Sequence, residues 1–186
     1  DRFIQHHAER EIDNAVARYR AKQGAVLVLE VKTGRILAMA KSPGYDPNRY
    51  YEHSPFSLRN FSFIDSFEPG STMKIISLAS MLERNPSTVN RQYTCRGWAD
   101  IADVRINCTG VHGTIDMADI IRHSCNVGVI EAVKGIRKKD LYETLVKFGF
   151  GRKTGVELPG ETEGILRPWE KWSGLSKFSM AIGQEI

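Results

Sequence analysis

The sequence contains no uninterrupted apolar run of the roughly 18 residues that a transmembrane helix requires, and it does not open on a signal peptide. It has no internal repeat and no low-complexity tract. Lysine and arginine form no basic stripe interleaved with aromatic residues, so nucleic acid is not an expected partner despite a net charge of +4. With 41% hydrophobic and 26% charged residues among 186, the composition predicts one globular domain with a sizeable core.

Cysteine is also scarce, with three residues at positions 95, 108 and 125. There is no Cys-x-x-Cys pair and no histidine-rich spacing, so neither a metal site nor a cofactor is expected. Cys95 and Cys108 flank a turn-rich segment. They either form a disulfide across a hairpin in an oxidising compartment or remain buried thiols, and the sequence leaves both open.

Hydrophobic periodicity predicts a mixed α/β (α+β) chain. A strand over 24–31 turns at 32–35 and returns as a hairpin partner over 36–40. Residues 42–66 are expected to be irregular, 88–113 to be a surface excursion of short strands and turns, and 151–164 to be a loop. Apolar residues at helical spacing predict helices over 2–21, from about 71 to 84, and over 116–123, 127–133 and 138–148. Residues 176–182 fit either a strand or a helix.

The segment Phe67-Glu68-Pro69-Gly70-Ser71-Thr72-Met73-Lys74 carries the first candidate site. A Pro-Gly turn places Ser71 in the first turn of a helix, and residues three apart share a helix face, so the Lys74 amine can reach the Ser71 hydroxyl. The helix N-terminus adds free N–H groups where an acyl oxyanion would form. An apolar run, which includes Ile75 and Leu78, is expected to bury the helix. A Ser-x-x-Lys pattern occurs about once by chance in a chain of this composition, so its context decides its meaning.

Ser124 and Asn126 form the second candidate element, between two short predicted helices. In an extended link, residues two apart point the same way, so the hydroxyl and the amide would project together. A hydroxyl can relay a proton, and an amide can both donate to a substrate carbonyl and accept from a lysine. A helix-capping Ser/Asn pair is the alternative.

These motifs together resemble those of the class B (monofunctional) penicillin-binding proteins, whose transpeptidase domains use Ser-x-x-Lys, Ser-x-Asn and Lys-Thr/Ser-Gly. The glutamate before Pro-Gly-Ser is similar to that of the division and sporulation members. The resemblance extends over nearly the whole chain, through Gly34-Arg35-Ile36-Leu37-Ala38-Met39-Ala40, Pro43-Gly44-Tyr45-Asp46-Pro47-Asn48, Arg59-Asn60, His112-Gly113, Ser124-Cys125-Asn126-Val127-Gly128, Phe148-Gly149-Phe150-Gly151, Thr154-Gly155-Val156-Glu157-Leu158-Pro159-Gly160-Glu161 and Gly183-Gln184.

The resemblance implies the serine β-lactamase/DD-peptidase fold, an antiparallel sheet flanked by helices. It implies that Ser71 attacks the D-Ala-D-Ala end of a peptidoglycan stem peptide and that an amine from a neighbouring stem resolves the acyl-enzyme. Lys74 would act as base with a pKa well below its usual value of about 10.4, and Ser124 and Asn126 would orient it and relay the proton. β-Lactams, other wall-synthesis or divisome proteins, and an extracytoplasmic position tethered to the inner membrane are implied in the same way.

Lys153-Thr154-Gly155 matches the third motif in letters, but it precedes Val-Glu-Leu-Pro-Gly-Glu, a separate landmark of the family. The resemblance places the catalytic Lys-Thr/Ser-Gly on a strand after a Gly-Gln segment such as Gly183-Gln184. Lys153 is therefore given no catalytic role. Residues 1–186 are expected to be a partial transpeptidase domain, inactive by itself.

Two other functions remain open. A β-lactamase or penicillin sensor shares the serine and lysine, but the chain has no Glu-x-x-Leu-Asn element of the class A type. A non-catalytic scaffold for wall synthesis would not need the third motif. Of the residues beside the motifs, His112 and Cys125 are interpreted as structural, and His123 is not expected to pair with Ser124 because adjacent helical residues point apart.

Overall fold

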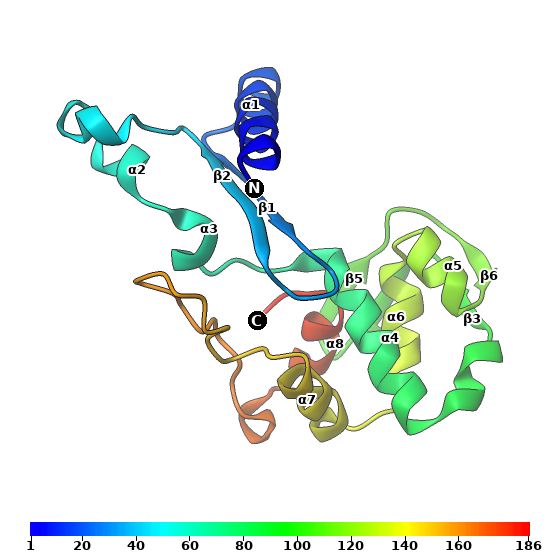
Figure 1. Cartoon of the computed structure of the whole chain (residues 1–186). Coiled ribbons are helices and arrows are strands. Elements are labelled where there is room, and N and C mark those ends of the chain that lie inside the picture. Colours follow the sequence, from blue (N-terminus) through cyan, green and yellow to red (C-terminus); the bar gives the residue numbers. More distant parts are fainter. The chain divides into compact units, whose positions relative to one another are not determined.

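The computed structural model describes residues 1–186, which form two compact units with separate hydrophobic cores (Figure 1). The first unit comprises residues 1–65 together with 159–161. The second comprises residues 66–158 together with 162–186, and it contains every candidate site residue.

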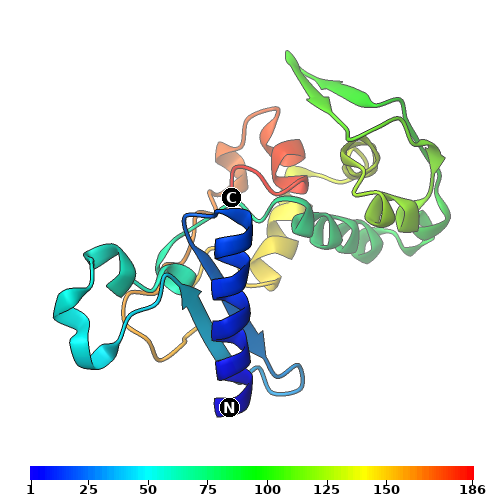
Figure 2. The same cartoon turned by 90° about the horizontal axis from the view of Figure 1, so that it is seen from above.

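The first unit is built on one helix and one hairpin. Helix α1 (Arg2–Tyr19) lies along the antiparallel strands β1 (Gly24–Leu29) and β2 (Ile36–Ser42), as Figure 2 shows. The small side chains of Ala38 and Ala40 let the helix approach β2 closely. The predicted helix and hairpin are thus confirmed. The segment expected to be irregular forms three short helices, η1 (Pro47–Glu52), α2 (Pro55–Leu58) and α3 (Phe61–Ile64).

The second unit is organised around helix α6 (Asn126–Val133), whose residues Val129, Ile130 and Ala132 are fully buried. Helices α4, α5 and α8 and strands β3, β4 and β5 contact it. A helix that is apolar on all sides must be enclosed in this way to be stable. The helices of this unit are η2 (Gly70–Thr72), α4 (Met73–Arg84), η3 (Pro86–Asn90), α5 (Met117–Arg122), α6, α7 (Lys138–Lys147), η4 (Trp169–Lys171) and α8 (Ser176–Ala181).

Helix α4 follows the prediction in length but not in its buried face. It ends at Arg84 because the following Asn85 precedes a proline and takes an extended conformation. Ile75, predicted to be buried, is 60% exposed, whereas the buried face includes Lys74 and Ser77. A charged residue therefore occupies a core position of this helix.

The strands of the second unit form two antiparallel pairs, β3–β6 and β4–β5, as the mixed fold with flanking helices predicted. The prediction of a surface excursion over 88–113 is wrong for the inward face of these strands, since Tyr93, Cys95 and Ala99 belong to the core. These strands are three or four residues long and lie among turn residues, so the alternation of buried and exposed side chains is too short to recognise in the sequence. The bounds are β3 (Tyr93–Cys95), β4 (Trp98–Ile101), β5 (Val104–Asn107) and β6 (Gly113–Ile115).

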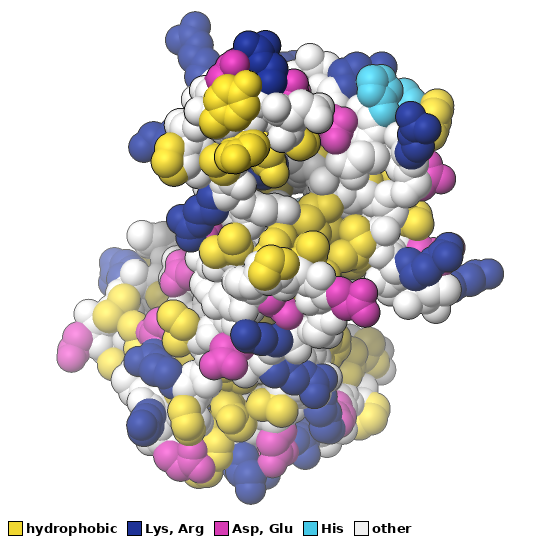
Figure 3. Space-filling model, turned by 60° about the vertical axis from the view of Figure 1, so that its left-hand side comes forward, with side chains coloured by type: hydrophobic (Ala, Val, Ile, Leu, Met, Phe, Trp, Pro, Cys, Tyr) yellow, Lys and Arg dark blue, Asp and Glu magenta, His cyan; other side chains and the backbone are white.

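None of the helices combines the length and the hydrophobicity that crossing a bilayer requires. On the face shown in Figure 3, basic side chains are interspersed with acidic and apolar ones. No extended patch of one charge sign is visible on that face.

Candidate active site

Ser71 lies in the short turn η2, directly before α4, and its side chain is exposed. Gly70 starts the turn with a φ of +58°, in the left-handed region that glycine adopts at little cost. The Thr72 hydroxyl donates to the Pro69 carbonyl at 2.7 Å and closes the turn. The Pro-Gly turn and the start of the helix are therefore where the sequence predicted them.

Lys74, at the second position of α4, is only 1% exposed, and its amine is bound on all sides. Nζ donates to Ser71 Oγ at 3.1 Å, to Ser124 Oγ at 2.9 Å and to the Ser124 carbonyl at 2.5 Å. A protonated lysine has three donors, and these contacts use all of them. The structure thus brings together three of the four predicted site residues.

Burial lowers the pKa of Lys74 below its ordinary value, because a desolvated ammonium is less stable than the neutral amine. The nearby Cys108 and Cys125 act in the opposite direction and raise it. The net direction is downward. A neutral Lys74 would present its lone pair to the Ser71 hydroxyl, which is what a general base needs.

Ser124 reaches the lysine through its backbone conformation. It has a φ of +50° and lies between α5 and α6, so its carbonyl and its hydroxyl both face Lys74. The predicted extended link is wrong, because Ser124 is left-handed and Cys125 already caps α6. The Sγ atom of Cys125 accepts from the Gly128 N–H at 3.1 Å.

Asn126 does not join the lysine cluster. As the first residue of α6 it donates from Nδ2 to the Asn107 carbonyl at 2.9 Å, and the donors of Lys74 are taken by Ser71 and Ser124. The predicted Asn126–Lys74 contact is therefore absent. The amide ties α6 to the residue that ends β5.

The turn before Ser71 is held by the last residues of the chain. The Gly70 N–H donates to the Gly183 carbonyl at 3.0 Å, and the Glu185 N–H donates to Glu68 Oε1 at 2.9 Å. Sequence reasoning recognised Gly183-Gln184 as a landmark but missed this contact. No local signal reports it, because the partners are more than 110 residues apart.

The three cysteines gather beside the second motif, together with His112. All three cysteines are free thiols in the structure. Of the two alternatives for Cys95 and Cys108, a disulfide or two separate thiols, the structure therefore has the second. His112 Nδ1 lies 3.5 Å from Cys95 Sγ and 3.7 Å from Cys108 Sγ, and Cys108 Sγ lies 3.6 Å from Cys125 Sγ. Sequence reasoning missed the cluster. The one short spacing, Cys108-x-x-x-His112, combines two residue types, and the other ligands lie far away along the chain.

The cysteine thiols differ in acidity. Burial raises the pKa of Cys125 to about 12, with the neighbouring cysteines acting in the same direction. Burial also raises the pKa of Cys108, but the N–H groups of Val127 and Asn126 donate to its sulfur and bring the pKa down to about 6. Cys125 is therefore a poor nucleophile, in line with its interpretation as a structural residue.

His123 stacks on His112, with ring centroids 5.1 Å apart.

Lys153 lies in the exposed segment after α7, outside any strand.

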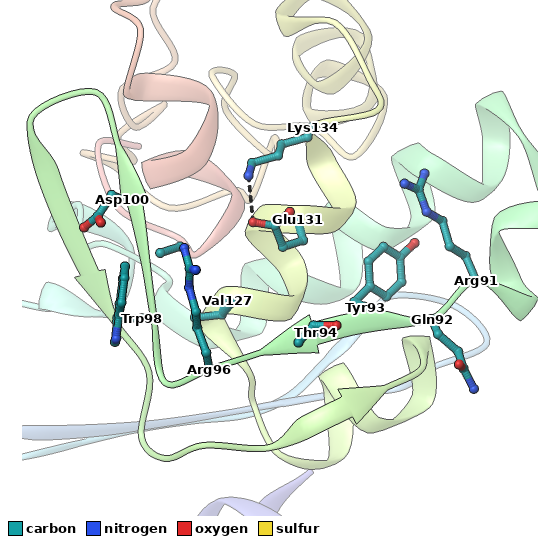
Figure 4. A pocket seen from close by; sticks show the side chains of 11 residues that line it. Arg91, Gln92, Tyr93, Thr94, Arg96, Trp98, Asp100, Val127, Glu131 and Lys134 are labelled. Atoms are coloured by element: carbon teal, nitrogen blue, oxygen red, sulfur yellow. Dashed lines mark hydrogen bonds and ion pairs between the residues drawn. The ribbon is translucent and has the colours of Figure 1, made fainter.

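A separate pocket of about 450 Å³ is formed by residues of β3, β4 and α6 (Figure 4). Its basic side chains already have partners, since Lys134 pairs with Glu131 at 2.7 Å and Arg96 stacks 4.2 Å from the centre of the Trp98 ring. The pocket contains none of Ser71, Lys74 and Ser124.

Comparisons with known proteins show similarity over nearly the whole chain. Residues 24–186 match the family model described as "Penicillin binding protein transpeptidase domain". The chain is 36% identical, over all of its length, to the stage V sporulation protein D of Bacillus subtilis, and 34% identical, over 98% of its length, to a probable peptidoglycan D,D-transpeptidase PenA of Neisseria flavescens. It spans 29% and 46% of the lengths of these two relatives.

Among solved structures, penicillin-binding protein 3 of Mycobacterium tuberculosis, complexed with ampicillin, superposes with a TM-score of 0.92 at 30% identity. The match covers all of this chain and 42% of that one. A domain of penicillin-binding protein 3 from Burkholderia pseudomallei gives a TM-score of 0.87 at 26% identity and is covered to 52%. The fold implied by the resemblance is thereby confirmed.

Proposed function

The chain belongs to the family of penicillin-binding protein transpeptidase domains, and from this we propose that the whole protein is a peptidoglycan D,D-transpeptidase with Ser71 as its nucleophile. The observation that carries the proposal is the buried Lys74 amine, 3.1 Å from Ser71 Oγ and 2.9 Å from Ser124 Oγ. A hydroxyl, a desolvated amine and a second hydroxyl in contact are what an acyl-serine mechanism needs.

In the acylation step, Ser71 Oγ attacks the carbonyl carbon between the two terminal D-alanines of a stem peptide. Neutral Lys74 accepts the hydroxyl proton, and the proton passes through Ser124 Oγ to the departing amine as the C–N bond breaks. The products are an ester on Ser71 and free D-alanine. Because Ser71 is exposed, a second substrate can reach the ester formed on it. Lys74 is buried and stays shielded from water.

In the second step, the amine of a neighbouring stem peptide attacks the ester and forms the crosslink. Lys74 and Ser124 now take a proton from that amine and return one to Ser71 Oγ, the first transfer in reverse. A β-lactam has the same acylating carbonyl, but its leaving group stays attached after ring opening, so the acyl-serine persists. We propose β-lactams as ligands of Ser71 for this reason.

Asn126 is proposed to contact the substrate. One N–H of its amide is used on the Asn107 carbonyl, and this leaves the second N–H and the oxygen for the backbone of a stem peptide. Its place one residue after Cys125 puts it beside the segment that carries Ser124. It would orient the peptide and take no proton.

We propose further that residues 1–186 are a partial transpeptidase domain. The relatives and the solved domains are longer than the matched region. The strand with Lys-Thr-Gly or Lys-Ser-Gly would come from the rest of the protein and bind the substrate carboxylate. The substrate is outside the cytoplasmic membrane, so the proposal places the domain there, at the inner membrane together with other wall-synthesis or division proteins.

A fluorescent penicillin tests the nucleophile. The whole protein is expected to form a covalent adduct that survives denaturation, and Ser71→Ala is expected to form none. Ser87→Ala, at an exposed serine in η3, is the matched control and should label like the unaltered protein. An adduct on Ser71→Ala would refute the assignment.

The same assay separates the transpeptidase from the alternatives. A stable adduct together with crosslinking of stem peptides supports the transpeptidase. Rapid release of the hydrolysed antibiotic would instead indicate a β-lactamase. A folded protein that forms no adduct would indicate a scaffold.

A further inference from the structure

Four side chains converge next to the second motif, from four different places in the second unit. Cys95 ends β3, Cys108 follows β5, His112 precedes β6, and Cys125 caps α6. The three sulfur atoms and a ring nitrogen of His112 all lie within 4.8 Å of one another. The proposed reaction uses none of them.

The separations fit one metal ion bound by all four side chains. Tetrahedral zinc, with Zn–S bonds of about 2.3 Å and Zn–N bonds of about 2.0 Å, keeps its sulfur ligands about 3.8 Å apart and sulfur and nitrogen about 3.6 Å apart. The structure has 3.6 Å between Cys108 Sγ and Cys125 Sγ, and 3.5 and 3.7 Å from His112 Nδ1 to the sulfurs of Cys95 and Cys108. We infer that Cys95, Cys108, His112 and Cys125 bind a zinc ion.

A disulfide would account for only part of this cluster. Bridging any two of the cysteines, with their sulfur atoms about 2.05 Å apart, would leave the third thiol and the histidine without a common partner. Three thiols and an imidazole nitrogen that face one point form a Cys₃His set. Such a set selects zinc over the harder ions magnesium and calcium.

The surroundings suit a bound thiolate. Cys95 and Cys125 are 1% and 0% exposed, so their thiolates would be costly to bury without a cation between them. The Gly128 N–H points at Cys125 Sγ from 3.1 Å and can stabilise its charge. Four protein ligands leave no open coordination position, so the ion is structural and activates no water.

The site has a positioning role for the candidate active site. It joins three segments of the second unit, namely β3, the loop between β5 and β6, and the start of α6. Ser124, which holds Lys74, directly precedes the ligand Cys125, and Asn126 directly follows it. Zinc would therefore fix the segment from which both motif side chains project.

Metal content and cobalt spectroscopy of the whole protein test the inference. We expect one zinc per chain after purification without chelator. Cobalt(II), added to the zinc-free protein, should give the intense visible bands of a tetrahedral ion and the near-ultraviolet band of a cobalt–thiolate bond, and one equivalent of zinc should abolish both. These spectra use the unaltered protein, so they do not depend on whether any variant folds.

Variants identify the ligands. Since loss of an outer-shell partner costs 10–100-fold in affinity, loss of a ligand in Cys108→Ser or His112→Ala should weaken zinc binding by more than about 100-fold. His53→Gln changes a histidine of the first unit and should bind zinc as the unaltered protein does. Zinc should also raise the melting temperature of the unaltered protein and protect three thiols from alkylation.

Three results would overturn the inference. They are a zinc-free protein whose cobalt complex is octahedral, thiols that react equally fast with and without zinc, and equal zinc affinity in Cys108→Ser and the unaltered protein. None of these measurements involves acylation. The zinc site and the transpeptidase proposal can therefore fail independently.

Discussion

Gly183 lies so close to Gly70 that a Cβ atom placed on it would be 2.0 Å from the Gly70 carbonyl oxygen. The same pair is joined by the hydrogen bond from the Gly70 N–H to the Gly183 carbonyl at 3.0 Å. Gly183 also has a φ of +81°, which side chains with a Cβ rarely adopt. The residue after Gly70 is Ser71, so the position of the nucleophile depends on a glycine 112 residues further along the chain.

Gly183→Ala should therefore slow acylation as well as lower stability. The methyl group must displace the backbone of Gly70, and a shift of about 1 Å at a reacting group can cost about 100-fold in rate. The left-handed φ adds about 1–3 kcal/mol of strain. The measurement is the second-order rate constant of penicillin acylation, together with the melting temperature.

Gly174→Ala is the matched control for this substitution. A Cβ atom on Gly174 would meet no heavy atom within 4 Å, so both its acylation rate and its melting temperature should stay close to those of the unaltered protein. An unchanged acylation rate in folded Gly183→Ala would contradict the link between the two segments.

The acylation rate should rise with pH and level off below the range of an ordinary lysine. Burial lowers the pKa of Lys74, and only its neutral form can accept the Ser71 proton. The rate should climb about tenfold per pH unit while Lys74 is protonated and become flat above its lowered pKa. Rate profiles for penicillin, recorded with circular dichroism to verify folding, measure the inflection.

His123→Gln controls for the nearby imidazoles. If Lys74 sets the profile, this variant leaves the inflection in place, although His123 stacks on His112 beside the second motif. An inflection at the ordinary lysine value of about 10.4 would contradict a lowered pKa. An inflection that moves in His123→Gln would assign the titration to histidine.

The sequence predicts well what depends on neighbours along the chain. The Ser71–Lys74 contact follows from a spacing of three residues, and the bounds of α4 follow from Pro86 and the Pro-Gly turn. The hairpin β1–β2 was likewise predicted from strand propensity and a short turn. In each case the interacting groups lie within one or two local elements.

Contacts between distant segments were not predictable in the same way. The sequence of residues 124–126 is compatible both with an extended link and with the start of a helix. The structure has the helix start, and there Ser124 contacts Lys74, which lies 50 residues earlier in the chain. Asn126 binds the Asn107 carbonyl, which no spacing indicates. The cysteine cluster combines residues up to 30 positions apart, so only the folded chain shows that they share one point.

Lys153→Ala should leave penicillin acylation within about twofold of the unaltered rate, as is usual for an exposed side chain away from a site. Lys153 is exposed in the segment after α7, although its neighbours spell the third motif of the family. Lys74→Ala, measured in parallel, should lose about 10²–10⁴-fold because it removes the general base. A loss of that size in Lys153→Ala would show that this segment takes part in acylation.

Asp140 should make stability fall between about pH 4 and pH 2. Its carboxylate accepts from Arg137 Nη2 at 2.7 Å, from Arg137 Nε at 3.0 Å and from the Arg137 N–H at 2.9 Å. These bonds, opposed by burial, lower its pKa to about 2. The unfolded chain binds the proton first, near pH 3.9, so the native state loses about 2 kcal/mol as the pH falls to about 2 and little below that.

Asp140→Asn should remove this part of the pH dependence. Urea unfolding at a series of pH values measures the difference in the free energy of unfolding between the variant and the unaltered protein. That difference should be largest above pH 4 and shrink toward pH 2. Asp103→Asn, at an exposed aspartate in the β4–β5 turn, should parallel the unaltered protein throughout. A constant difference for Asp140→Asn across this range would mean that its ion pair with Arg137 contributes nothing to stability.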